Sequence, residues 1–401
     1  MGTFHPPSSE NIGTFNGVTY TRYKGKFTGK TACGEFAVPY EITTPKNPQE
    51  GNRTLVEEPP HFASGLVARD GALSPKFLFD NGFGHVSAGF SSIGGRILDP
   101  APGFKPKICG QELPTPTPIT DYNILRQLAL TLRENPPDFV GKVGGIYGIG
   151  LSESGNTVHE IYKLFGHKLF DITFACNASY FEPVKISGQK PIFVFNTEAD
   201  FDPRAVPNPA FPQYRWYSVA CGAHISDSVL ARRFFPDPPR PGSPALPVAG
   251  TFPINWLLIL RALFIAGDRW VRSGVEPPPS TTLTVNAQGV IARDIRCNAL
   301  GGIRHPAVET GEATFIASVV RGNGWELFGG YSKPKRLEAS EFPGYLESFK
   351  KATEALLAAK FLLPSGRNRL LREVQLHPPN TYTLNYMQGR LFPPPLSDVD
   401  E

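Results

Sequence analysis

Three features that mark common protein classes are scarce or absent in this sequence of 401 residues. Its 5 cysteines include no C-x-x-C pair, and they are too few and too scattered for a disulfide framework or a zinc site. The formal net charge is +4 and no block of like charges occurs, so there is no basic stripe for nucleic acid. The longest apolar run, from Ile254 to Gly267, contains Arg261 and is too short to span a bilayer. We therefore expect neither nucleic acid nor a membrane as a partner.

The beginning of the sequence shows no pattern typical of a signal peptide. The first residues, MGTFHPPSSENIG, have neither a positively charged start nor an apolar stretch. The odd number of cysteines leaves at least one free thiol, which favours a reducing compartment. We expect a cytoplasmic protein, and a secreted one is the alternative if a leader has been trimmed. The oligomeric state stays open.

The residues that are present are typical of a globular protein with a sizeable core. Hydrophobic residues make up 40% of the sequence and charged residues 19%, which is unlike the composition of disordered chains. The 40 glycines and 41 prolines indicate many loops over a rigid scaffold. A chain of this length accommodates one large α/β domain or two ordinary ones.

Strand-like and helix-like segments alternate through the middle of the sequence. Continuous apolar runs predict buried strands, and apolar residues spaced by three and four predict helices. The expected strands lie at 141–150, 190–200 and 214–224, and the expected helices at 120–136, 154–166 and 254–272. This order predicts an α/β fold with a mainly parallel central sheet flanked by helices.

The two ends of the sequence give less regular patterns. We expect a frayed arm at 1–14, antiparallel strands at 15–45, one more strand at 53–58 and another at 76–90. A helical hairpin is expected at 343–373.

A single domain is expected at 15–401. Its core covers about 15–225 and a closing helix at 254–272. An insert at 226–250 and a C-terminal extension at 274–401 exceed what such a core needs, and we expect them to form a rim or cap over a pocket. Six aromatic residues in these parts either line that pocket or belong to ordinary core: Phe234, Phe235, Phe252, Trp256, Trp325 and Phe328.

The stretch YGIGLSESGNTVHEIY, at 147–162, places Ser152 where a predicted strand changes into a predicted helix. A sharp turn of this kind exposes a serine hydroxyl above the sheet as a nucleophile. The turn needs small residues two positions before and two positions after the serine, and Gly150 and Ser154 occupy these positions. The match to G-x-S-x-G differs at one residue, because serine replaces the last glycine and Gly155 follows it.

The same turn predicts where a reacting carbonyl oxygen would bind. The beginning of the helix and the Glu153 amide point toward that oxygen, and helix N-termini stabilise negative charge. Glu153 is therefore the first expected donor of an oxyanion hole.

A serine hydroxyl becomes an effective nucleophile only when a base takes its proton. The expected base is a histidine later in the chain, with an orienting carboxylate between the two in sequence. His224 follows a predicted strand in the motif CGAHISD. Carboxylates follow the strand before it, and Asp200 is the first choice, Glu198 the second and Asp202 the third. We therefore predict a triad of Ser152, His224 and either Asp200 or Glu198.

Two further patterns are near matches to known motifs. GKFTGKT at 25–31 has three residues where a P-loop has four between its first glycine and its Gly-Lys pair, and we interpret it as a turn between strands. His159 and Glu160 lie on a predicted helix, but Lys163 stands where the H-E-x-x-H zinc motif has its second histidine. We expect no metal and no cofactor.

These motifs resemble the α/β-hydrolase superfamily. More narrowly, they are similar to the larger bacterial and fungal hydrolases known as the alpha/beta hydrolase domain family. The shared motifs are G-x-S-x-S-G at 150–155, T-E-x-D at 197–200, G-x-H at 222–224, GVEPPPS at 274–280 and NALGGIRHP at 298–306. The last two are the more specific, and the resemblance covers about 20–373. It implies the α/β-hydrolase fold and ester-type hydrolysis of a small molecule by a serine enzyme.

One loop departs from the family pattern. The family often reads VEWLN where this chain has VEEPPHF at 56–62. Such folds usually supply the second oxyanion amide from this loop, and its two prolines have no N–H to donate. We therefore expect His61 or Phe62 as the second donor.

We therefore expect a serine esterase or lactonase that hydrolyses a carboxylic ester or lactone through an acyl-enzyme on Ser152. Two alternatives stay open. One is an acyltransferase that uses the same triad, and the other is a non-catalytic protein that binds a small molecule on the hydrolase scaffold. The sequence does not name the substrate.

Overall fold

In the computed structural model of the chain, the described residues are 1–15, 18–45, 53–57, 73–88, 107–112, 122–178, 182–184, 190–204, 207–224, 254–317, 329–332 and 337–376. They belong to two compact units. The first contains Met1–Val194 and Phe211–Tyr214, and the second contains Phe195–Ala210 and Arg215–Glu401. The single domain predicted at 15–401 stays a prediction. The insert predicted at 226–250 lies outside the described residues.

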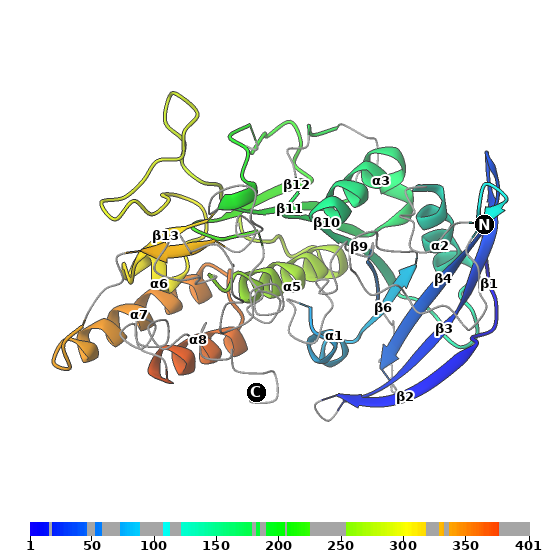
Figure 1. Cartoon of the computed structure of the whole chain (residues 1–401), viewed down its shortest axis with the longest axis horizontal. Coiled ribbons are helices and arrows are strands. Elements are labelled where there is room, and N and C mark those ends of the chain that lie inside the picture. Colours follow the sequence, from blue (N-terminus) through cyan, green and yellow to red (C-terminus); the bar gives the residue numbers. More distant parts are fainter. Residues whose placement is uncertain are drawn as a thin grey trace, which may run out of the picture. The chain divides into compact units, whose positions relative to one another are not determined.

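The first unit is built on a mixed sheet. Its strands are β1 (Thr3–Phe4), β2 (Ser9–Phe15), β3 (Val18–Thr31), β4 (Gly34–Pro45), β5 (Arg53–Glu57), β6 (Phe83–Ala88), β9 (Gly145–Leu151), β10 (Ile172–Cys176) and the first half of β11 (Ile192–Thr197). The hydrogen-bonded order is β1-β3-β4-β6-β5-β9-β10-β11, with β2 paired to β3. β3 and β4 form a long antiparallel hairpin (Figure 1). β5 runs parallel to both β6 and β9, as β9 does to β10.

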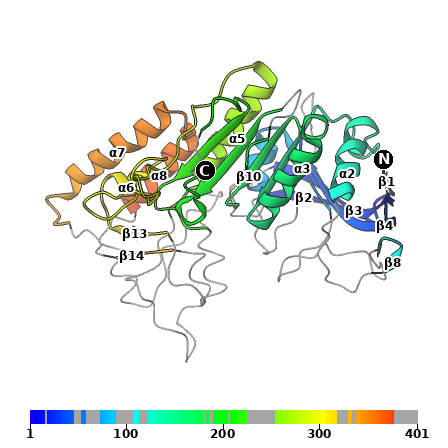
Figure 2. The same ribbon diagram turned by 90° about the horizontal axis from the view of Figure 1, so that it is seen from above.

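Burial explains why the central strands are continuously apolar. Residues 145–150 of β9 and all of β10 are buried, as expected for parallel strands that are covered on both faces. Helices α2 (Tyr122–Glu134) and α3 (Glu153–Leu169) lie side by side against the sheet (Figures 1 and 2). The leucines of α2 recur every three or four residues and enter one core cluster with the buried residues of β3 and β4. The predicted α/β class is confirmed.

The second unit begins with the rest of β11, followed by a short 3-10 helix at Glu198–Asp200 and then β12 (Tyr214–Val219) from Arg215 onward. Its helices are α5 (Leu257–Ser273), α6 (Pro306–Glu309), α7 (Phe342–Ala358) and α8 (Pro364–Leu376), and β13 (Thr314–Ile316) pairs with β14 (Gly330–Ser332). The predicted closing helix and helical hairpin are confirmed as α5 and as α7 with α8. α5 ends at Gly274, whose φ of 68° is the left-handed conformation that favours glycine.

The segment 280–303 of the extension lies along β12. Parallel bridges join Tyr217 to Thr281 and Val219 to Ile303, and Gly302 lies so close to β12 that a Cβ there would be 2.6 Å from the Ser218 carbonyl oxygen. The extension therefore pairs with an edge of β12 that would otherwise be open. This contact explains Gly302 of the NALGGIRHP motif, whereas a Cβ at Gly301 would lie 2.6 Å from the Thr284 backbone nitrogen.

Four local predictions were wrong. Residues 1–14 contain strands β1 and β2 rather than a frayed arm, and GKFTGKT lies inside strand β3 rather than at a turn. Residues 75–80 form helix α1 before β6, because the Ser74 side chain caps the helix and proline occupies its first position. α3 passes through Gly166 and ends at Leu169, since one glycine costs only about 1 kcal/mol in a helix that is packed against a sheet.

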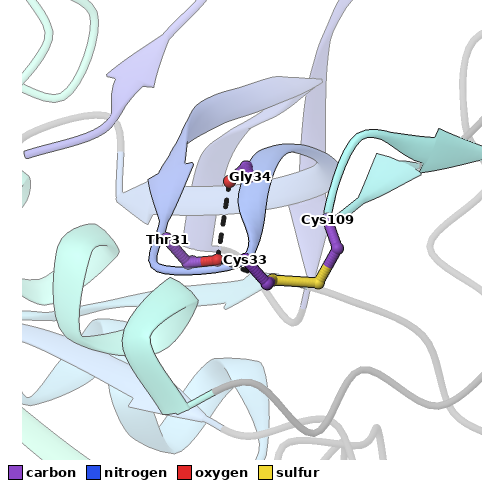
Figure 3. Close-up of a disulfide and its surroundings, with 4 residues drawn as sticks. All are labelled: Thr31, Cys33, Gly34 and Cys109. Carbon is purple, nitrogen blue, oxygen red and sulfur yellow. Dashed lines mark hydrogen bonds between the residues drawn. A yellow bond between two sulfur atoms is a disulfide. The ribbon is translucent and has the colours of Figure 1, made fainter.

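The cysteine prediction was also incomplete, because the structure contains one disulfide. Cys33 lies at the tip of the β3–β4 hairpin, and Cys109 lies at the turn between β7 (Lys107–Ile108) and β8 (Gln111–Glu112). The two sulfur atoms are bonded across a sequence separation of 76 residues (Figure 3). Cys176 and Cys221 are free and buried, and Cys297 is free and exposed.

Within the described ranges, no helix has both the length and the apolar character that crossing a bilayer requires.

Candidate active site

Ser152 lies in the first unit at the junction of β9 and α3. The strand ends at Leu151 and the helix begins at Glu153, so a single residue makes the turn. That residue has φ 63° and ψ −126°, a combination that residues other than glycine adopt only under strain. The Ser152 amide donates to the Cys176 carbonyl at 2.9 Å, which fixes the turn against β10. The Ser152 hydroxyl does not accept a capping hydrogen bond from α3.

The small residues around Ser152 are required by backbone contacts. A Cβ at Gly150 would lie 2.1 Å from the Ser154 carbonyl oxygen, and a Cβ at Gly155 would lie 2.7 Å from the Cys176 carbonyl oxygen. Either distance is far below van der Waals contact. The third small residue of the motif is therefore needed at position 155, and Ser154 is accommodated as a buried side chain.

The geometry of this turn suits an oxyanion site. Glu153 is the first residue of α3, and the first amides of a helix have no carbonyl partner within the helix. Glu153 directly follows Ser152, and its N–H lies at the positive end of the helix dipole. His61 and Phe62, the predicted second donors, lie outside the described residues.

Asp200 and His224 lie together in the second unit. The carboxylate Oδ1 of Asp200 is 2.7 Å from Nδ1 of His224, and the other oxygen accepts a hydrogen bond from the Thr197 hydroxyl at 2.9 Å. Both side chains are largely buried, with 17% of Asp200 and 10% of His224 exposed. With the proton on Nδ1, the imidazole carries its lone pair on Nε2, which is the arrangement of a general base.

The other two candidate acids have different partners. Glu198 accepts a hydrogen bond from the Cys221 amide at 2.8 Å and pairs with Arg293 at 2.6 Å. Asp202 pairs with Arg204 at 2.7 Å, and a side-chain hydrogen bond from Arg204 lowers the pKa of the Asp202 carboxyl. Of the three carboxylates, Asp200 is the one that has a hydrogen bond to His224 in the structure.

Close backbone packing joins the loop that carries the acid to the loop that carries His224. A Cβ at Gly222 would lie 3.0 Å from Cβ of Thr197, and the Ala199 amide donates to the Gly222 carbonyl at 3.2 Å. The T-E-x-D and G-x-H motifs thus pack directly against each other. Ser152 belongs to the first unit, and the Asp200–His224 pair belongs to the second.

Of the six aromatic residues suggested for a rim, one is described. Trp256 is 1% exposed and packs on Phe195, and its indole N–H donates to the Ala223 carbonyl at 3.0 Å. It is therefore a core residue that also fixes the loop before His224. Phe234, Phe235, Phe252, Trp325 and Phe328 lie outside the described residues.

Arg293 was missed by the sequence analysis. It lies 95 positions beyond Glu198, in the C-terminal extension, and no local pattern marks it. Its role depends on the pairing of the extension with β12, which is a long-range contact.

Among the described residues, no group of three or more His, Cys, Asp and Glu side chains is arranged to hold a metal ion. His159 instead lies in the core next to Tyr214, and burial lowers its pKa to about 3.

The parallel strands, the flanking helices and the strained serine turn define the α/β-hydrolase fold. The model of the family described as "Alpha/beta hydrolase domain" matches residues 42–372, so the chain belongs to this family. Membership supports a hydrolase. The predicted fold and family are confirmed.

The similarity to solved structures is weaker than the match to the family model. An arylesterase is 16% identical over 41% of this chain and 48% of its own, with a TM-score of 0.25. A brefeldin A esterase, a bacterial homologue of human hormone-sensitive lipase, is 14% identical over 39% and 40%, with a TM-score of 0.25. The esterase Est22 is 12% identical over 45% and 64%, with a TM-score of 0.30. The matches thus span less than two thirds of each of these chains. None of the curated protein sequences matches this chain significantly.

Proposed function

We propose that the protein is a serine hydrolase that cleaves a carboxylic ester or lactone through an acyl-enzyme on Ser152. The observation that carries the proposal is the hydrogen bond between Asp200 and His224 at 2.7 Å, which orients an imidazole for base catalysis. The strained turn at Ser152 supports it from the other unit. The proposal requires Ser152 Oγ to come within hydrogen-bonding reach of His224 Nε2.

In the first step, Ser152 Oγ attacks the ester carbonyl carbon while His224 Nε2 takes the hydroxyl proton. Asp200 holds the imidazole in the required tautomer and stabilises its charged form. The proton on Nε2 then passes to the alkoxide oxygen of the leaving group, and the C–O bond of the ester breaks. An acyl group remains on Ser152.

The oxyanion that forms during each step needs donors that are already in place. The Glu153 amide is one, and an amide of His61 or Phe62 is the proposed second. A single such donor typically contributes about 3–4 kcal/mol to the transition state. Water then attacks the acyl carbon while His224 Nε2 takes one of its protons. The imidazolium returns this proton to Ser152 Oγ as the bond from Oγ to the acyl carbon breaks, and the free acid leaves.

A fluorophosphonate probe tests the nucleophile. We expect labelling of the protein, loss of labelling in Ser152→Ala, and retention in Ser348→Ala, an exposed serine of α7. Turnover of a small aryl ester is expected to follow the same pattern. If the Ser152→Ala variant is labelled and active, the proposal is wrong. Release of free acid alone in a mixture of water and alcohol supports hydrolysis over acyl transfer.

A further inference from the structure

Glu198 carries a buried negative charge in the second unit, two residues before Asp200. Only 8% of the residue is exposed. Its two oxygens have separate partners, since one lies 2.6 Å from the Arg293 guanidinium and the other accepts the Cys221 amide at 2.8 Å. A buried carboxylate is tolerated when it is paired and hydrogen-bonded. Glu198 is therefore a bridge between the C-terminal extension and the turn that leads to His224.

The turn that Glu198 holds is under backbone strain. Cys221 has a φ of 61°, and the left-handed region costs a residue other than glycine of order 1 kcal/mol or more. Such a conformation persists only when the surrounding contacts fix it. The Cys221 amide and the Gly222 carbonyl are each hydrogen-bonded to the segment Glu198–Asp200.

Arg293 reaches Glu198 from a segment that is itself firmly attached. The backbone of Thr281 exchanges hydrogen bonds with Trp216 and Ser218 of β12, at 2.8 and 2.9 Å. Farther along, Ile303 exchanges hydrogen bonds with Ser218 and Ala220, at 2.7 and 3.0 Å. An antiparallel bridge joins Arg293 to Ala299 between these two anchors. The backbone of Arg293 is thus held relative to the strand that precedes His224.

We propose that Arg293 is a positioning residue, and that its ion pair with Glu198 holds the Cys221–His224 turn so that the imidazole meets Asp200. The Arg293 guanidinium lies 2.6 Å from one Glu198 oxygen, and the other Glu198 oxygen accepts the Cys221 amide. The extension therefore contributes to the triad through Glu198 without touching the reacting atoms. This inference rests on the proposed function for its kinetic consequence, and its structural consequence is measured separately.

The kinetic test begins with two variants of Arg293 and a control variant of another arginine. Arg293→Met leaves Glu198 without its cation, and we expect kcat for a small aryl ester to fall about 10- to 100-fold with KM changed less than about twofold. Arg293→Lys is expected to retain most of the activity because it keeps the charge. Arg367→Met removes a more exposed pair with Glu354, at 2.5 Å between α7 and α8, and is expected to leave kcat unchanged.

Glu198→Gln distinguishes positioning from general stability. Glutamine accepts the Cys221 hydrogen bond without a charge, so Arg293→Met combined with Glu198→Gln should recover most of the kcat that Arg293→Met loses. An arginine that stabilises the fold independently of Glu198 would not be rescued by a second change at Glu198. If Arg293→Met does not fold, recovery of folded and active protein in the double variant supports the proposal, and failure of the double variant overturns it.

The second measurement does not depend on activity. In Ser152→Ala protein, the downfield proton resonance of His224 Nδ1–H reports its hydrogen bond to Asp200. We expect this resonance to remain with Arg367→Met and to be lost or broadened with Arg293→Met. An unchanged resonance together with an unchanged kcat overturns the positioning role. If instead the protein hydrolyses no ester but the resonance responds as expected, the proposed function is wrong and the role of Arg293 stands.

Discussion

The carboxylates of Glu198 and Asp200 lie on one turn of 3-10 helix and have different partners. Asp200 accepts from the imidazole of His224, whereas Glu198 accepts from the Cys221 backbone and pairs with Arg293. Glu198 and Asp200 have one residue, Ala199, between them, and their different partners indicate different roles. One orients the proposed base, and the other holds the loop on which that base lies.

The first prediction concerns this division. Asp200→Asn is expected to lower kcat by about 10⁴ near neutral pH, because an amide stabilises the wrong imidazole tautomer. Glu198→Gln keeps the acceptor for Cys221 and should remain at least about a hundredfold more active than Asp200→Asn. Steady-state hydrolysis of an aryl ester by both variants checks this. If Glu198→Gln or Asp202→Asn lowers kcat more than Asp200→Asn does, the residue replaced in that variant is the triad acid instead of Asp200.

The second prediction concerns the serine turn. Gly150→Ala places a Cβ 2.1 Å from the Ser154 carbonyl oxygen, so β9 or α3 must shift. Overpacking of this kind costs typically about 1–3 kcal/mol, and we expect a lower Tm together with loss of fluorophosphonate labelling. Gly344→Ala is the control, because nothing lies within 4 Å of a Cβ there and alanine favours the helix. Equal labelling and Tm in both variants would contradict a tightly packed turn.

Local patterns were sufficient for some of these features and insufficient for others. The turn at Ser152 was predictable because its small residues lie within six positions of one another. α1 was missed since its start depends on the Ser74 cap, and the apolar residues 77–79 fit a strand as well as a helix. The choice between Glu198 and Asp200 needed the positions of Cys221 and Arg293, which no short motif encodes.

Cysteine pairing shows the same limit. Cys33 and Cys109 become neighbours only when a hairpin tip meets a distant turn, and sequence spacing does not define that meeting. The bond also weakens the expectation of a reducing compartment, because structural disulfides persist mainly in oxidising ones.

The third prediction follows from the states of the five cysteines. In native protein, one thiol, Cys297, should react quickly with a thiol reagent. Burial raises the pKa of the Cys221 thiol to about 12 and also raises that of Cys176, so both stay protonated and protected. Unfolded protein should show three reactive thiols without reductant, consistent with the three free cysteines, and all 5 after reduction. Five without reductant would contradict the disulfide.

The disulfide itself should stabilise the first unit. Replacing Cys33 and Cys109 together by serine removes a cross-link over 76 residues, and removal of such a bond typically costs about 2–4 kcal/mol. We expect a lower Tm for the double variant, and the same decrease when reductant is added to the original protein. Reductant should not change the Tm of the double variant further, and such a change would point to another cross-link.

The last prediction is that the buried His305 lowers the free energy of unfolding of the protein in acid. Burial lowers the pKa of His305 to about 3, against a usual value near 6.5 in an unfolded chain. Between these values the unfolded state binds a proton that the folded state does not, so this residue favours the folded state fully only above about pH 6.5. Its contribution falls by about 1.4 kcal/mol for each unit of pH down to about 3.

His305→Asn tests this contribution, because asparagine can still cap α6 where the histidine ring now accepts the Ala307 amide. The variant loses the packing of the ring on Phe349, so it should be less stable at pH 7. Its free energy of unfolding should nevertheless fall less steeply between pH 6 and pH 4 than that of the original protein. Urea unfolding at several pH values measures both slopes, and parallel slopes would mean that His305 is protonated in the folded protein.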